Sequence, residues 1–130
     1  MIVGKAIYNI LINDSDILGT VSTRIFPEIA AQGETQPYIV YSVVSNNPSD
    51  TKDDNGNIDE AQVEVYCFHN KYSDAIDLGV KVRAALERKN GTFGGVKIQS
   101  INYTNEQMDV NPERSIWVAI QDYTIRINNS

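Results

Sequence analysis

The chain has 130 residues, 42% of them hydrophobic and 22% charged, which is ordinary for a globular protein, and we expect a single domain that spans residues 1–130. Its net charge of −6 argues against nucleic-acid recognition, which normally needs a basic surface, and no apolar stretch approaches the roughly 20 residues of a membrane span. A single cysteine, Cys67, excludes an internal disulfide.

The first part of the chain predicts two helical pieces and a short extended segment. The apolar residues of 2–12 fall on one helical face. Asp14 or Ser15 is suited to cap a further helical turn that reaches Val21. The polar face of these pieces is not basic, which argues against a membrane-surface role. Residues 24–27 predict a brief strand that ends at its proline.

Two strands joined by a long loop are expected next. Residues 37–44 are dominated by β-branched and aromatic side chains, which predicts a strand. Residues 60–68 alternate between apolar side chains such as Val65 and a second, mixed face that includes Tyr66. The polar stretch 46–57 between them predicts a long acidic hairpin loop, and loops of this length are usually functional or mobile.

Residues 73–89 predict the one long amphipathic helix, with the flanking strands forming the sheet that it covers. Ser73 is suited to cap the first turn, and Asn90 with Gly91 is a typical helix stop. Apolar residues between these caps recur at helical spacing.

The remaining chain predicts two further strands. The alternation of residues 96–103 slips near Ser100, which indicates a bulge. Residues 105–113 read as a polar link, and 115–127 as the last strand. The first half of that strand is apolar on both faces, so we expect it inside the sheet or at a subunit contact. The predicted fold class is α+β: a mostly antiparallel sheet of about four strands, packed by one long central helix and a short N-terminal helix, with a long acidic hairpin loop.

Two segments have spacings that suggest chemistry. Residues 51–62 place Gly56 and several oxygen-bearing side chains as in a calcium loop, but Thr51 and Gln62 stand where that loop needs carboxylates, which favours a solvated acidic loop. Cys67 and His69 share one strand face about 7 Å apart, too far for a thiol–imidazole pair. We therefore expect no catalytic residue, no cofactor, no metal and no enzymatic activity.

The order of several short segments resembles the tail-completion, or tail-to-head joining, proteins of bacteriophages with long flexible tails and of related prophages. The most specific match is Arg-Ile-Phe-Pro at 24–27 followed by Pro-Tyr-Ile-Val-Tyr at 37–41. The other matching pieces are residues 5–8, 65–68, the helix at 73–89 and residues 121–125. The resemblance implies a structural role: such proteins form a ring, usually sixfold, on the head-proximal end of the tail tube, stop its growth and offer a surface to the head connector.

The resemblance also implies the partners and the location. We expect other copies of the chain, hexameric in the virion with a monomer in solution left open, together with the tail-tube protein and the head connector or stopper protein. No direct nucleic-acid or membrane contact is expected, and the protein is expected in the virion after synthesis in the host cytoplasm. Two alternatives stay open: a small cytosolic ligand-binding or enzymatic α+β domain, and another head–tail connector or minor tail component.

The acidic loop suggests where a ring contact would form. A like-charged loop repeated around a ring repels itself unless it meets basic groups of a neighbour or of the tube. The expected interface residues are Asp50, Asp53, Asp54, Asp59, Glu60, Arg24, Arg83, Arg88 and Lys89.

Overall fold

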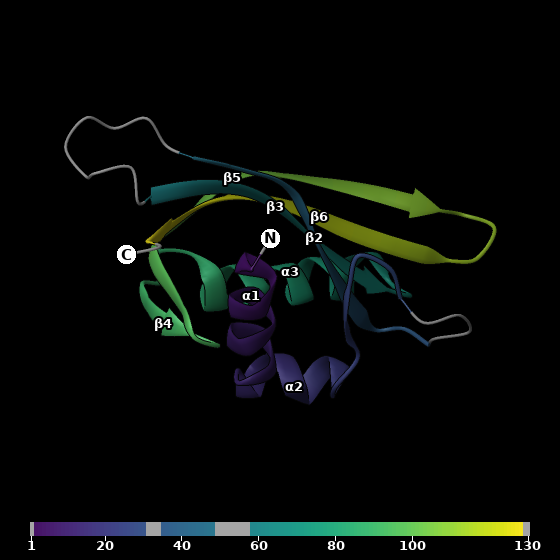
Figure 1. The fold of residues 1–130 in the computed structure, drawn as a ribbon. Helices are drawn as coiled ribbons and strands as arrows, with labels where there is room; N and C mark the ends of the chain where they lie inside the picture. Colours follow the sequence, from purple (N-terminus) through teal and green to yellow (C-terminus); the bar gives the residue numbers. More distant parts are fainter. Residues whose placement is uncertain (1, 31–34, 49–57, 129–130) are drawn as a thin grey trace.

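The computed structural model describes residues 2–30, 35–48 and 58–128. In these ranges the chain forms three helices and six strands (Figure 1). None of the helices described is long and apolar enough to cross a membrane. In chain order the elements are α1 (Val3–Ile12), α2 (Ser15–Val21), β1 (Ile25–Pro27), β2 (Tyr38–Pro48), β3 (Ile58–His69), α3 (Tyr72–Leu86), β4 (Gly91–Phe93), β5 (Val96–Asn111) and β6 (Ile116–Asn128).

The six strands form one mixed sheet in the order β1-β2-β3-β6-β5-β4. β1 pairs with β2 in parallel, and every other neighbouring pair is antiparallel. The sheet curls, and all three helices lie on one side of it (Figure 1). We call the side that carries the helices the closed face and the other side the open face.

The expected fold class is wrong in both its parts. The sheet has six strands rather than about four, because β1 and β4, each of three residues, extend it at its two ends. The helical layer is not one long central helix with a short partner: α3 has 15 residues, α1 has 10, and α2 adds a separate helix of seven.

The predicted helix at 73–89 begins earlier and ends earlier than expected. Lys71 is the N-cap residue and no side chain caps the first turn, so Ser73 does not have the predicted capping role. At the other end Glu87 turns to extended backbone and Arg88 has a positive φ of 65°. The Arg88 backbone N–H then donates to the Ile101 carbonyl oxygen over 2.9 Å. Attachment of the chain to β5 therefore ends α3 before the predicted stop.

Two polar segments predicted as connections are partly strand. β2 continues through Asn46 to Pro48, opposite Ala61 and Asp59 of β3, whereas the predicted loop began at Asn46. β5 continues to Asn111, although residues 105–113 were predicted to be a link. Backbone pairing with a neighbouring strand, rather than an apolar face, holds these polar residues extended. The rest of the predicted acidic loop, residues 49–57, lies outside the described residues.

Other sequence-based expectations are confirmed. The N-terminal helix is α1, and the Asp14 carboxylate accepts from the N–H groups of Asp16 (3.0 Å) and Ile17 (3.1 Å) at the start of α2. The register of β5 against β6 shifts between Ile98 and Ser100, at the predicted bulge. β6 lies inside the sheet between β3 and β5, in agreement with the apolar character of both its faces.

The hydrophobic core lies between the closed face and the helices. Alternate residues of β6, from Ala119 to Ile127, are buried there, and Ile7 of α1, Leu78 of α3 and Ile101 of β5 are also almost fully buried. Period-two alternation on strands with one covered face, and the apolar stripes of the helices, account for this arrangement.

Candidate functional site

The open face carries an apolar surface that no helix covers within the described residues (Figure 1). Since side chains alternate along strands, residues adjacent to core positions point to this face. At one end of the sheet they are aromatic or aliphatic and mostly only half-buried. We define them as the aromatic patch, which consists of Phe26, Tyr38, Val40, Tyr66, Phe68, Ile116, Val118 and Ile120.

Cross-strand pairing orders the rings of the aromatic patch. Tyr38 of β2 lies directly opposite Phe68 of β3, and their rings stack with centroids 4.7 Å apart. The Tyr66 ring lies 6.3 Å from Phe68 on the same strand, and Phe26 of β1 meets the edge of Tyr38 at 6.1 Å. Such contacts hold aromatic side chains in fixed positions on a pleated surface.

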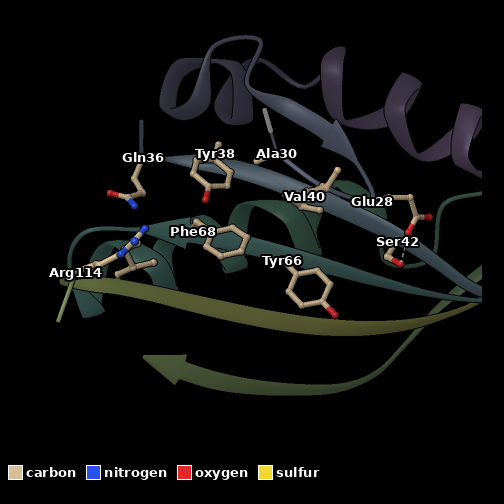
Figure 2. Close-up of a pocket in the computed structure, with 11 residues that line it drawn as sticks. Glu28, Ala30, Gln36, Tyr38, Val40, Ser42, Tyr66, Phe68 and Arg114 are labelled. Atoms are coloured by element: carbon tan, nitrogen blue, oxygen red, sulfur yellow. Dashed lines mark hydrogen bonds between the residues drawn. The ribbon is translucent and has the colours of Figure 1, made fainter. Parts of the chain in front are cut away.

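Part of the patch lines an open cavity of about 490 Å³; the patch residues that line it are Tyr38, Val40, Tyr66, Phe68 and Ile116. Figure 2 shows Tyr38, Phe68 and Tyr66 in a row across the floor, with Arg114 and Gln36 at one end and Glu28 with Ser42 at the other. An apolar floor with single charged groups at its ends is suited to contact another macromolecule.

Glu28 closes the edge of β2 beside this cavity. It has a positive φ of 64°, which turns the chain back after β1. Its carboxylate accepts from the Ser42 hydroxyl (2.8 Å) and from the Val43 N–H (3.1 Å), while its own N–H donates to the Tyr41 carbonyl oxygen (2.8 Å). Glu28 thus satisfies the backbone groups of β2 that follow the short pairing with β1.

Beyond the aromatic patch the open face becomes polar and acidic. The Tyr66 hydroxyl donates to a Glu64 carboxylate oxygen over 2.8 Å. This bond, with a smaller contribution from burial, raises the pKa of Tyr66 to about 12. Asp122 lies opposite Glu64 on β6; its Oδ2 accepts from Asn105 Nδ2 (3.2 Å), while its buried Oδ1 has no hydrogen-bond partner among the described residues.

On the closed face, a buried polar cluster joins β6 to α3. The Gln121 side chain is fully buried, and its Nε2 donates to the Gly79 carbonyl oxygen (2.7 Å) and to Glu106 Oε1 (3.1 Å). The Tyr123 hydroxyl donates to Gln121 Oε1 over 2.6 Å, and burial raises the pKa of Tyr123. Every polar group of Gln121 is therefore paired, so this cluster is a structural contact rather than an open site.

Within the described part of the chain, neither the thiol nor the imidazole forms part of a catalytic pair. Cys67 is fully buried, and burial raises the pKa of its thiol, which keeps it protonated. His69 Nδ1 accepts from the Asn70 N–H (2.9 Å) and lies 4.0 Å from an Asp74 carboxylate oxygen at the start of α3. Among the residues described here, no group of three His, Cys, Asp or Glu side chains could hold a metal ion.

The predicted interface residues that the structure describes lie in separate places. Asp59 and Glu60 lie at the start of β3, where Asp59 accepts from Asn46 Nδ2 (3.2 Å) and Glu60 lies 3.6 Å from Arg126. The basic members are Arg24, whose Nε donates to the Pro37 carbonyl oxygen (2.9 Å), Arg83, which pairs with Glu87 (3.0 Å), and the exposed Arg88 and Lys89 after α3. Asp50, Asp53 and Asp54 lie outside the described residues.

The aromatic patch was not identified as a site from the sequence. Part of its signal is in the sequence, because the first half of β6 is apolar on both faces, which is compatible with a place inside the sheet or with a subunit contact. The sequence does not give the order of the strands in the sheet, and that order places Tyr38, Phe68 and Val118 side by side.

Comparisons with known proteins identify a matching family and solved structures with a similar fold. The sequence model of the family described as "Tail completion protein gp17" matches residues 5–128. A chain in the solved structure "Virion of native gene transfer agent (GTA) particle" superposes with a TM-score of 0.75 over 95% of this chain and 92% of that chain. The two sequences are 13% identical, so this likeness shows a shared fold. No curated protein sequence matches the chain.

Proposed function

Because the chain belongs to the family described as tail completion protein gp17, and is therefore a structural protein of the phage virion, we propose that it closes the head-proximal end of the tail tube as a ring and joins it to the head connector. The observation that carries this proposal is the family match over residues 5–128. The fold shared with a chain of a virion particle supports it.

The open face gives the proposed role a physical basis. A protein that joins two larger structures needs surfaces that folding leaves available. The aromatic patch is such a surface: it is apolar, ordered by ring stacking and not covered by any helix described here. In the proposed ring, hexameric in the virion, its partners are adjacent copies, the tail-tube protein and the connector or stopper protein.

The experiment is complementation of a phage that lacks this gene. We expect the deletion to yield tails that are irregular in length and separate from heads, and the wild-type chain to restore joined particles of uniform tail length. Electron microscopy of particles and plaque counts measure the two effects. Joined, infectious particles from the deletion phage without complementation would overturn the proposal.

The acidic residues of the predicted loop belong to the same proposal. Charge reversal at Asp53 and Asp54 should leave the free chain folded and reduce infectivity, because the sequence predicts a solvated loop there and charges in such a loop contribute little to stability and more to the choice of partner. The matched control reverses Asp16 and Asp77, two exposed carboxylates on α2 and α3. Equal infectivity of the two double variants would remove the loop from the interface.

A further inference from the structure

The cavity on the open face has an unpaired cation at one end. Arg114, in the turn between β5 and β6, lines the cavity together with Gln36, and Figure 2 shows the Arg114 side chain reaching toward Gln36. The Arg114 backbone N–H donates to the Asn111 carbonyl oxygen (3.2 Å), but its guanidinium group forms no hydrogen bond or ion pair with any residue in the described ranges. A free guanidinium beside an apolar floor is suited to bind a carboxylate.

The other end of the cavity borders a row of carboxylates. Ser42, Glu64 and Asp122 lie directly opposite one another across β2, β3 and β6, and Glu28 accepts from the Ser42 hydroxyl. We define Glu28, Glu64 and Asp122 as the acidic row. Like charges directly opposite on neighbouring strands are destabilising, and no basic side chain of the described residues forms an ion pair with the row. Within the same ranges the carboxylates are not placed to hold a metal ion, so the matching charge is that of a lysine or arginine of a partner.

The distance between the two ends sets the spacing of charges in a ligand. On β3, Glu64 precedes Phe68 by four residues, or about 13 Å of extended chain, and Arg114 lies at the Phe68 end. The rings of Phe68 and Tyr66 occupy the interval (Figure 2). In an extended segment, residues i and i+4 are also about 13 Å apart and point to the same side, with residue i+2 between them. A carboxylate, an apolar side chain and a cation at alternate positions therefore match this surface.

The shape of the surface favours an extended segment. The floor of the cavity comes from β2, β3 and the start of β6, which makes it two strand spacings, or about 10 Å, across. A helix is about 10–12 Å wide with its side chains and would fill this width before it reached the rings. The sheet curls around the helices, so the open face is its outer side (Figure 1). Two such faces placed together would hold both floors apart, which argues against a second copy of the chain as the occupant.

We propose that the cavity binds an extended segment of another virion protein, in which a carboxylate pairs with Arg114, an apolar side chain packs on Phe68 and Tyr66, and a lysine or arginine lies against the acidic row. This inference rests on the proposed function and names the chemistry of one partner. The aromatic floor provides the apolar contact, and the charged groups at its two ends provide the selectivity.

The first test is an NMR titration of the free chain, labelled at tyrosine Cζ, with the synthetic peptide acetyl-Glu-Thr-Val-Thr-Lys-amide. We expect saturable changes at Tyr38 and Tyr66, and none at Tyr123, which is buried on the closed face. The neutral peptide acetyl-Gln-Thr-Val-Thr-Gln-amide is the matched control and should bind at least about twofold more weakly, because exposed ion pairs contribute factors of this size. Arg114→Gln should weaken the binding of the charged peptide to a similar extent, and its exposed position should leave the fold intact.

Three results of the titration would overturn the proposal. The first is that the resonances of Tyr38 and Tyr66 do not change when the charged peptide is added. The second is equal affinity for the charged and the neutral peptide. The third is a change at these tyrosines that depends on the concentration of the chain in the absence of peptide, because a second copy would then occupy the cavity.

Complementation of the deletion phage provides the second measurement. Arg114→Glu should lower infectivity at least about tenfold without a change in the thermal unfolding of the free chain, since it places like charge against the carboxylate of the partner. The matched control is Lys5→Glu, which reverses an exposed cation on α1, on the closed side of the sheet, and should have little effect. Full infectivity of Arg114→Glu would overturn the docking alone. A deletion phage that is infectious without complementation would instead overturn the proposed function, whatever the peptide titration shows.

Discussion

The two faces of the sheet are formed by the same strands, but their side chains differ in how far they are buried and hydrogen-bonded. On the closed face even the polar Gln121 is fully buried with all its groups paired. On the open face Tyr38, Tyr66 and Phe68 are only half-buried although they are stacked, and one buried oxygen of Asp122 has no hydrogen-bond partner in the described ranges. The closed face therefore supplies the stability of the fold, and the open face holds apolar area that folding does not use.

This difference should appear most strongly as a difference in stability between two isoleucines of β6. Ile125 is fully buried on the closed face, whereas Ile120 is half-buried in the aromatic patch. Ile125→Ala should lower the free energy of unfolding by about 2–5 kcal/mol because it leaves a cavity. Ile120→Ala should cost about 1 kcal/mol, in proportion to the smaller area it buries. Urea denaturation measures both, and equal losses would contradict the distinction.

The polar cluster of the closed face should be the next most sensitive feature. Gln121→Leu removes the acceptor of the buried Tyr123 hydroxyl and the donor to Gly79 and Glu106. We expect a loss of about 1–3 kcal/mol, the usual range for leaving buried polar groups unpaired. Gln107→Leu, at an exposed position of β5, is the control and should change the stability by less than about 0.5 kcal/mol. A loss in Gln121→Leu no larger than the control's would mean that water replaces the glutamine.

The same two faces explain what could be predicted from the sequence. The strand at 115–127 was predicted because one of its faces is buried from Ala119 to Ile127, which imposes alternation on that part of the sequence. The far half of β5 was missed because neither of its faces is apolar throughout: Asn105, Gln107 and Asp109 are exposed on the open face, and on the other face only Met108 is partly buried against the core. Only the pairing with β6 defines this segment as strand.

The candidate site was predictable to a smaller extent. The nine expected interface residues were chosen by charge. Those described are distributed over three places, before β1, at the start of β3 and in or just after α3, and several already have partners within the chain. The aromatic patch depends on the order in which distant strands pair. Local periodicity carries no information on that order, so the row from Tyr38 to Val118 could be seen only in the folded chain.

Alanine substitutions at two helical glycines separate the effect of helix propensity on stability from the effect of packing on the closed face. A Cβ on Gly79 would lie 3.2 Å from Gln121 Nε2, whose position is fixed by hydrogen bonds, whereas nothing lies within 4 Å of a Cβ on Gly19 of α2. Gly19→Ala should stabilise the protein by about 0.5–1 kcal/mol, the gain usual for alanine in a helix. Gly79→Ala should lose that gain and destabilise by about 1 kcal/mol through strain at Gln121. Thermal unfolding compares the two, and stabilisation by both would show that Gln121 can move.

The smallest expected effect is a change in the pKa of one tyrosine, because the two faces raise tyrosine pKa values by different causes. On the open face the hydrogen bond to Glu64 is the main cause that raises the pKa of Tyr66 to about 12, whereas on the closed face burial is the main cause that raises the pKa of Tyr123. Glu64→Gln should therefore lower the pKa of Tyr66 toward 10 and leave Tyr123 unchanged, which NMR titration of tyrosines labelled at Cζ measures residue by residue.

The sign of the pH dependence follows from the direction of the Tyr66 shift. A pKa that is higher in the folded protein than in the unfolded chain means that the folded state binds the proton more tightly. The contribution of Tyr66 to the free energy of unfolding is thus fully present below about pH 10 and is lost as the pH rises through about 12. Glu64→Gln should weaken this loss between pH 10 and 12. If the pKa of Tyr66 is unchanged in that variant, burial is the main cause of the raised pKa on both faces. The two faces would then not differ in how they shift the pKa of a tyrosine.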